Sequence, residues 1–149
     1  MVQPAAAEGV SYEKDALEQI VNLSGCYAAF VQAYGKEAWN MAPSSPIKFA
    51  DVQAAEPVVQ SKLDDEFFHV RFEKATPAER RYMAAMADLG DGPCRTGEVA
   101  KRLGIGVSST SVHRDALIKK GLIYSPDHGE VDFTVPHFSP FTRRRYPLG

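Results

Sequence analysis

The order of local signals between Thr76 and Pro136 constrains the fold most. The run Thr76-Pro77-Ala78-Glu79 is a capping box with proline at the first helical position, which predicts a helix start. A second short helix is expected from Thr96, as its N-cap, to a stop at Gly104. A third is expected to be capped by Ser108 or Ser109 and to run to Lys120, where Gly121 ends it.

A hairpin signal follows these three helical segments. Leu122-Ile123-Tyr124 predicts one strand, and the alternating Val131, Phe133 and Val135 predict a second, with a tip at 127–129. Three short helices followed by a two-stranded ribbon are typical of a winged helix-turn-helix. The chain is therefore predicted to be mostly α, with a two-stranded wing.

The first half reads as helices. Residues 1–10 are expected to be a frayed end, and Ser11 is expected to cap a helix with an apolar stripe of Leu17, Ile20 and Val21. Gly25 should end that helix, and a second should span residues 26–39. A third should begin at Asp51, with Pro57 either kinking it or delaying its start. The predicted division is a helical domain over 1–73 and a winged-helix domain over 74–149.

The charge balance differs between the two halves. Residues 1–75 carry 6 Lys/Arg against 11 Asp/Glu, whereas residues 76–149 carry 11 against 8. An acidic half joined to a basic half indicates two modules, with any polyanion contact on the second. Because the basic excess is only +3, nucleic-acid binding is permitted but not required.

Other chemistries find little support. Cys26 and Cys94 are 68 positions apart and the four histidines are scattered, so neither a disulfide framework nor a metal site is predicted. The sequence contains no phosphate-binding loop and no nucleophile elbow, so this chain alone is not expected to be a catalyst or to hold a cofactor. With no apolar run of membrane-spanning length and no signal peptide, a cytoplasmic location without membrane contact is expected.

The third helix of the motif carries the first candidate nucleic-acid contacts. The second helix of a helix-turn-helix normally enters the major groove by its N-terminal residues. Hydroxyl groups there donate to phosphates but discriminate bases poorly. Equally, they can simply cap and solvate the helix, and His113 can be a half-buried structural residue one turn before Leu117, unless Val112 and Ala116 face the core instead. The candidates on this helix are Ser108, Ser109, Thr110, Ser111, His113 and Arg114.

The remaining candidates are cationic or lie at the hairpin tip. Lys119 and Lys120 end the helix where its dipole favours cations, which is a sufficient structural reason for them. His128 lies at the tip between acidic residues, an unfavourable setting for gripping phosphate. The densest basic cluster consists of Arg143, Arg144 and Arg145. It can be interpreted as a clamp for phosphates or as a solvated terminal run between the aromatic anchors Phe138, Phe141 and Tyr146.

The stretch from Arg80 to Pro136 resembles the C-terminal winged helix of a group of prokaryotic AAA-type ATPases related to the origin-recognition proteins. The resemblance is carried by Thr-Pro-Ala-Glu-Arg, Met-Ala-Asp-Leu-Gly-Asp-Gly-Pro, Gly-Glu-Val-Ala-Lys-Arg-Leu-Gly, Leu-Ile-Lys-Lys-Gly-Leu-Ile-Tyr-Ser-Pro and Phe-Thr-Val-Pro-x-Phe. Upstream, Ser24-Gly25 and the aromatic-rich helix to Trp39 look like the helical lid of such ATPases. The resemblance implies a lid-like bundle followed by a winged helix.

Two departures from that family limit what is carried over. The nucleotide-binding core is absent, so the chain looks like the C-terminal portion of a longer protein or a truncated relative. Gly25-Cys26-Tyr27-Ala28 offers no arginine for sensing nucleotide, so no nucleotide-binding residue is assigned. The expected function is a module that binds or positions double-stranded DNA with weak sequence specificity. The alternative is a protein-interaction module that docks on its own ATPase core or on another subunit.

Overall fold

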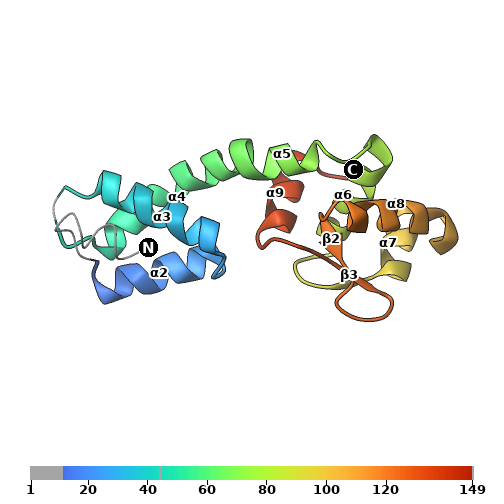
Figure 1. The fold of residues 1–149 in the computed structure, drawn as a ribbon, viewed down its shortest axis with the longest axis horizontal. Helices are drawn as coiled ribbons and strands as arrows, with labels where there is room; N and C mark the ends of the chain where they lie inside the picture. The colour runs from blue at the N-terminus through green and yellow to red at the C-terminus, as the bar shows by residue number, and fades with distance from the viewer. Residues whose placement is uncertain (1–11, 44, 149) are drawn as a thin grey trace. The chain divides into compact units, whose positions relative to one another are not determined.

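The computed structural model describes residues 12–43 and 45–148, which fold mostly as helices with a small three-stranded antiparallel sheet (Figure 1). They divide into two compact units, one up to Asp65 and one from Glu66. The division falls before the aromatic segment 66–72, whereas the sequence placed it after residue 73.

The first unit is built from helices α2 (Lys14–Ser24), α3 (Ala28–Met41) and α4 (Phe49–Leu63). Gly25 ends α2 in the left-handed conformation (φ 61°), as predicted. The core comes from all three helices and from the connection before α4; its largest members are Ile20, Phe30, Tyr34, Ile47, Val52 and Val59. Lys62 of α4 pairs with the mostly buried Glu37 of α3 at 2.5 Å.

Several boundaries in this unit differ from the sequence prediction. The proposed frayed end and the Ser11 cap lie outside the described residues. Because Cys26 has φ 61°, it cannot belong to a right-handed helix, and α3 begins at Ala28. Asp51 is not the N-cap of α4 but its third residue, where its carboxylate accepts the Lys48 N–H at 2.8 Å. The helix runs through Pro57 and does not start after it, and Val21 lies exposed, off the buried stripe.

In the second unit an aromatic cluster connects the first helical segment to the last helix. A π-helical turn (η1, Asp64–Phe68) leads into α5 (His69–Phe72), and helix α9 spans Phe138–Arg145. Phe68 lies 5.1 Å from Phe141 and 5.5 Å from Phe138 between ring centroids. Two aromatic anchors of the predicted tail, Phe138 and Phe141, are therefore buried and Tyr146 is half-buried; the arginine run is exposed as predicted, but it is the last turn of a helix.

Between these ends lie α6 (Pro77–Asp88), α7 (Thr96–Leu103) and α8 (Val107–Lys119), with strands β1 (Cys94–Arg95), β2 (Ile123–Tyr124) and β3 (Glu130–Phe133). The sheet order is β1-β3-β2, and all pairs are antiparallel. The core that these elements share includes Tyr82, Met83, Met86, Val99, Leu117, Ile123 and Val131.

Local capping explains where the helices of this unit start. The predicted capping box of α6 is confirmed: the Glu79 N–H donates to Thr76 Oγ1, and the Thr76 N–H donates to Glu79 Oε1. Thr96 is the first residue of α7 and not its cap, which is Arg95. Neither Ser108 nor Ser109 caps α8, because the chain already turns helical after Gly106. Strand β1 was not predicted, and it makes the sheet three-stranded instead of two-stranded.

Candidate nucleic-acid interface

Helix α8 has one buried side and one exposed side. Thr110 and Leu117 are 2% and 0% exposed and lie two turns apart, so they define the side that packs on the unit. Ser108, Val112 and Lys119 are spaced by four and seven residues, which places them together on the opposite side. Val112 is 68% exposed. The helix phase left open by the sequence is therefore fixed, with Leu117 and not Val112 in the core.

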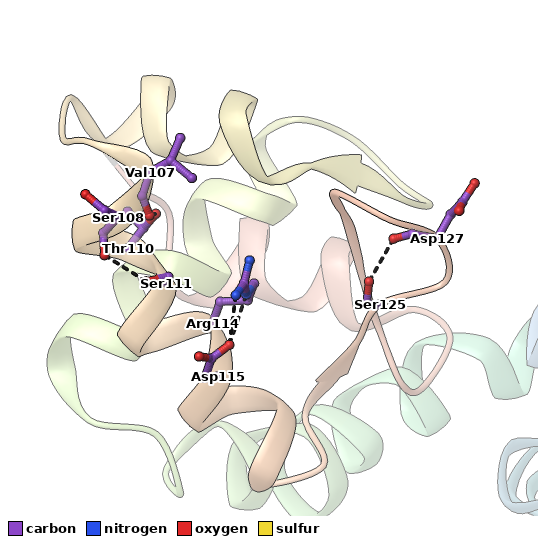
Figure 2. Close-up of polar contacts among 8 residues, drawn as sticks. All are labelled: Val107, Ser108, Thr110, Ser111, Arg114, Asp115, Ser125 and Asp127. Atoms are coloured by element: carbon purple, nitrogen blue, oxygen red, sulfur yellow. Dashed lines mark hydrogen bonds and ion pairs between the residues drawn. The ribbon is translucent and has the colours of Figure 1, made fainter.

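The hydroxyl groups at the start of α8 are not equivalent. The hydroxyl of Thr110 donates to the Val107 carbonyl at 2.8 Å, and that of Ser111 donates to the Ser108 carbonyl at 2.7 Å (Figure 2). Thr110 is buried, so a nucleic acid cannot reach it in this conformation, and the prediction that it contacts nucleic acid is wrong. Ser108 and Ser109 are exposed at the first turn.

Arg114 and His113 flank the buried side. Two nitrogens of the Arg114 guanidinium, Nε and Nη2, donate to Asp115 Oδ1 at 3.1 and 3.0 Å, and Figure 2 shows the two groups side by side. Burial raises the pKa of Tyr82 to about 12, and the nearby Arg114 opposes that rise in smaller measure. Arg114 thus lies near a core residue, with its charge already balanced. His113 is half-buried, as its structural interpretation predicted.

The two lysines at the end of α8 have different roles. Lys120 Nζ donates to Glu79 Oε1 at 2.5 Å, and the Glu79 side chain is 8% exposed. Burial raises the pKa of Glu79, but hydrogen bonds from Lys120 and Thr76 outweigh burial and leave the pKa below its ordinary value. Lys120 therefore ties α8 to α6. Lys119 is exposed and makes no ion pair within the described part of the chain.

The other candidates lie on other elements. His128 is exposed in the β2–β3 loop, where its N–H donates to the Asp127 carboxylate and the Ser125 hydroxyl donates to the Asp127 carbonyl. Arg143 on α9 donates to the Ala87 carbonyl at 2.8 Å and to Asp91 at 2.9 Å. Its neighbours Arg144 and Arg145 are exposed on the same helix.

The structure thus groups only part of the predicted set. Ser108, Ser109 and Lys119 share the exposed side of α8, whereas Lys120, Arg114 and Arg143 are engaged in contacts within the unit. Sequence reasoning missed the apolar part of this surface, since the phase of α8 was not fixed. Four exposed apolar side chains belong to α8 and the turn before it: Ile105, Val107, Val112 and Ile118. We call Ser108, Ser109, Val112 and Lys119 the α8 stripe.

Two absences hold for the residues that the structure describes. Over 12–43 and 45–148, no three His, Cys, Asp or Glu side chains are placed so as to hold a metal ion. Within the same ranges, no helix combines the length and apolar character needed to cross a membrane. Cys26 and Cys94 are both free thiols.

A protein-family model, described as Domain of unknown function (DUF8462), matches residues 65–142. This range is 78 of the 149 residues, about half of the chain, and the chain belongs to that family. No curated protein matches the chain. The family match begins at the division between the two units and contains α8, the sheet and most of α9.

Proposed function

We propose that residues 76–136 are a winged helix-turn-helix that binds double-stranded DNA with little sequence preference. We further propose that the chain is the C-terminal region of an AAA-type ATP-binding protein, without an enzymatic activity or cofactor of its own. The order α6-β1-α7-α8-β2-β3, with antiparallel strands in the order β1-β3-β2, supports the first part. The short connection from Gly104 to Gly106 turns α7 into α8, as a helix-turn-helix requires.

The α8 stripe is the observation that carries the DNA proposal. Gly106, the N-cap, has no side chain to accept from the amides of Val107 and Ser108, so these two N–H groups can donate to a phosphate at the positive end of the helix dipole. Ser108 and Ser109 add hydroxyl donors, and Lys119 adds a positive charge. Val112 offers methyl groups of the kind that contact thymine methyls. The stripe holds no Arg or Asn for bidentate base contacts, which is why little sequence preference is expected.

A second candidate function is docking on an ATPase core or a neighbouring subunit. The four exposed apolar side chains of α8 and the turn before it favour it, since exposed apolar surface suits contact with another protein. The acidic residues of the hairpin, Asp127 and Glu130, also suit a protein partner better than DNA. Both functions would use the same helix, so the test must separate them.

Fluorescence anisotropy with a labelled duplex tests the DNA proposal. Wild-type protein should bind at about 50 mM salt and lose most of its affinity by about 200 mM. Lys119→Ala should lower the slope of log K against log salt by about 1, whereas Lys36→Ala, which removes an exposed lysine of α3, should leave it unchanged. Absence of binding at low salt would sink the DNA proposal.

A matched pair of valine substitutions tests whether the α8 stripe is the surface in use. Val112→Glu places a carboxylate in the stripe, and Val70→Glu makes the same change at a 50% exposed position on α5. Only Val112→Glu should abolish duplex binding.

Size-exclusion chromatography with light scattering tests the docking alternative, because it measures the oligomeric state. A wild-type dimer that Val112→Glu dissociates, in protein that binds no DNA, would favour docking.

A further inference from the structure

A cavity of about 470 Å³ opens in the second unit on the side of the sheet and α9. One wall is the loop after α6, with Asp91 and Gly92. A second is the pair Tyr124 and Asp132, and a third is the connection from β3 to α9, which includes His137. No described residue of α8 lines it. The volume is within the range of sites that bind small ligands or single side chains.

Tyr124 and Asp132 face each other across the strands. They are register partners of β2 and β3, so their side chains project from the same face of the sheet. Tyr124 is 44% exposed, and its hydroxyl has no hydrogen-bond partner in the described ranges. Asp132 Oδ1 accepts the Phe133 N–H at 2.8 Å, which holds the carboxylate in place and leaves its second oxygen for a ligand.

The charges around the cavity favour a cation. Two carboxylates line it, Asp91 and Asp132, and only Asp91 is paired, with Arg143 at 2.9 Å. The cavity also has apolar lining residues, since Phe133, Val135 and Phe138 contribute to it and are almost fully buried. An exposed aromatic ring beside a fixed carboxylate, in a cavity with apolar lining residues, suits a positively charged head on an alkyl stem.

We propose that this cavity binds a guanidinium group, presented by an arginine side chain of a protein partner. A planar guanidinium can stack on the ring of Tyr124 while it donates to the second carboxylate oxygen of Asp132. A lysine ammonium is a point charge and cannot stack on the ring in this way. This proposal does not depend on DNA binding, since it uses the sheet and α9. It also assigns a role to the acidic hairpin, which is unsuited to gripping phosphate.

Titration followed by amide NMR tests the site with defined probes. N-acetyl-arginine amide should shift the resonances of Tyr124, Asp132 and His137 saturably, and the neutral, isosteric N-acetyl-citrulline amide should not. Equal shifts from citrulline, or no saturable shift from arginine, would overturn the proposal. A five-residue peptide with one central arginine should bind more tightly than the free diamine putrescine. Tighter binding of putrescine would overturn the assignment to a protein side chain.

Matched variants localise the binding. Asp132→Asn keeps an oxygen for the Phe133 N–H but removes the charge, and it should weaken arginine binding about 10-fold or more. Asp127→Asn makes the same change in the hairpin loop, outside the cavity lining, and should have no effect. Tyr124→Leu should weaken binding about 2- to 5-fold through loss of the ring. Equal effects of the two aspartate variants would contradict the site.

Discussion

Replacing Glu79 with alanine should destabilise the second unit, because one buried carboxylate joins two of its helices. Glu79 Oε1 accepts the Thr76 N–H at 3.2 Å and Lys120 Nζ at 2.5 Å. Loss of the capping bond costs about 1 kcal/mol, and loss of the charged hydrogen bond costs about 1.5–3 kcal/mol. Removing a desolvated carboxylate offsets part of that loss. We therefore expect Glu79→Ala to lower the free energy of unfolding by about 2 kcal/mol.

Urea unfolding followed by far-UV circular dichroism measures this change. Trp39, the single tryptophan, lies in α3, so its fluorescence follows the first unit and should not change. Glu98→Ala is the matched control: Glu98 is exposed on α7 and forms no ion pair in the described part of the chain. It should cost about 0.5 kcal/mol or less. Equal shifts from the two variants would refute this role of Glu79.

The same carboxylate should make stability depend on acid pH. Burial raises the pKa of Glu79, but hydrogen bonds from Lys120 and Thr76 leave it below its ordinary 4.5. A folded-state pKa below the unfolded value gives stabilisation that is present above pH 4.5 and lost as the pH falls through the lowered pKa. The stability difference between wild type and Glu79→Gln should therefore shrink on acidification below pH 4.5. A constant or growing difference would contradict this reasoning.

Three further outcomes are expected. Phe141→Ala removes a fully buried ring and should cost about 3–5 kcal/mol in urea unfolding, whereas a cost below about 1 would contradict a packed α9. Gly104→Ala, at a residue with φ 74°, should destabilise the protein by about 1–2 kcal/mol. Gly97→Ala, at a position in α7 with open space around it, should stabilise the protein by about 0.5 kcal/mol. Changes of the same sign for both variants would contradict the left-handed cap at Gly104. Iodoacetamide should alkylate the exposed Cys26 in folded protein but spare Cys94, and mass spectrometry can measure both rates. The reason is that burial, with smaller effects of Asp132 and Glu130, raises the pKa of the Cys94 thiol to about 11. Equal alkylation rates would contradict that burial.

The sequence was most informative where one local rule decides the structure. Thr76, Pro77 and Glu79 specify a helix start by themselves, and the structure has that start. The two-residue strand β1 escaped prediction because two residues are too few for an alternating pattern. Helix α9 escaped it because Pro140 and the arginine run read as an irregular tail, whereas Pro140 occupies the first turn, where proline is tolerated.

The candidate interface depended on packing that a single sequence does not reveal. The sequence of α8 allows either Leu117 with His113 or Val112 with Ala116 to face the core, and only contacts with other elements choose Leu117. Thr110 looked available because hydroxyls are usually exposed, but its bond to the Val107 carbonyl lets it be buried. The cavity had no sequence signal at all, since its walls come from three separate segments.

Mapping a duplex onto the protein by amide NMR tests the central proposal most directly. At low salt, a DNA duplex should shift amide resonances in α8 and the turn before it, most strongly at Ser108, Ser109 and Val112, and added salt should reverse the shifts. Resonances of the first unit and of the cavity around Asp132 should stay in place. Shifts that cluster at those places instead of α8, or no shifts at low salt, would contradict the proposed DNA-binding function.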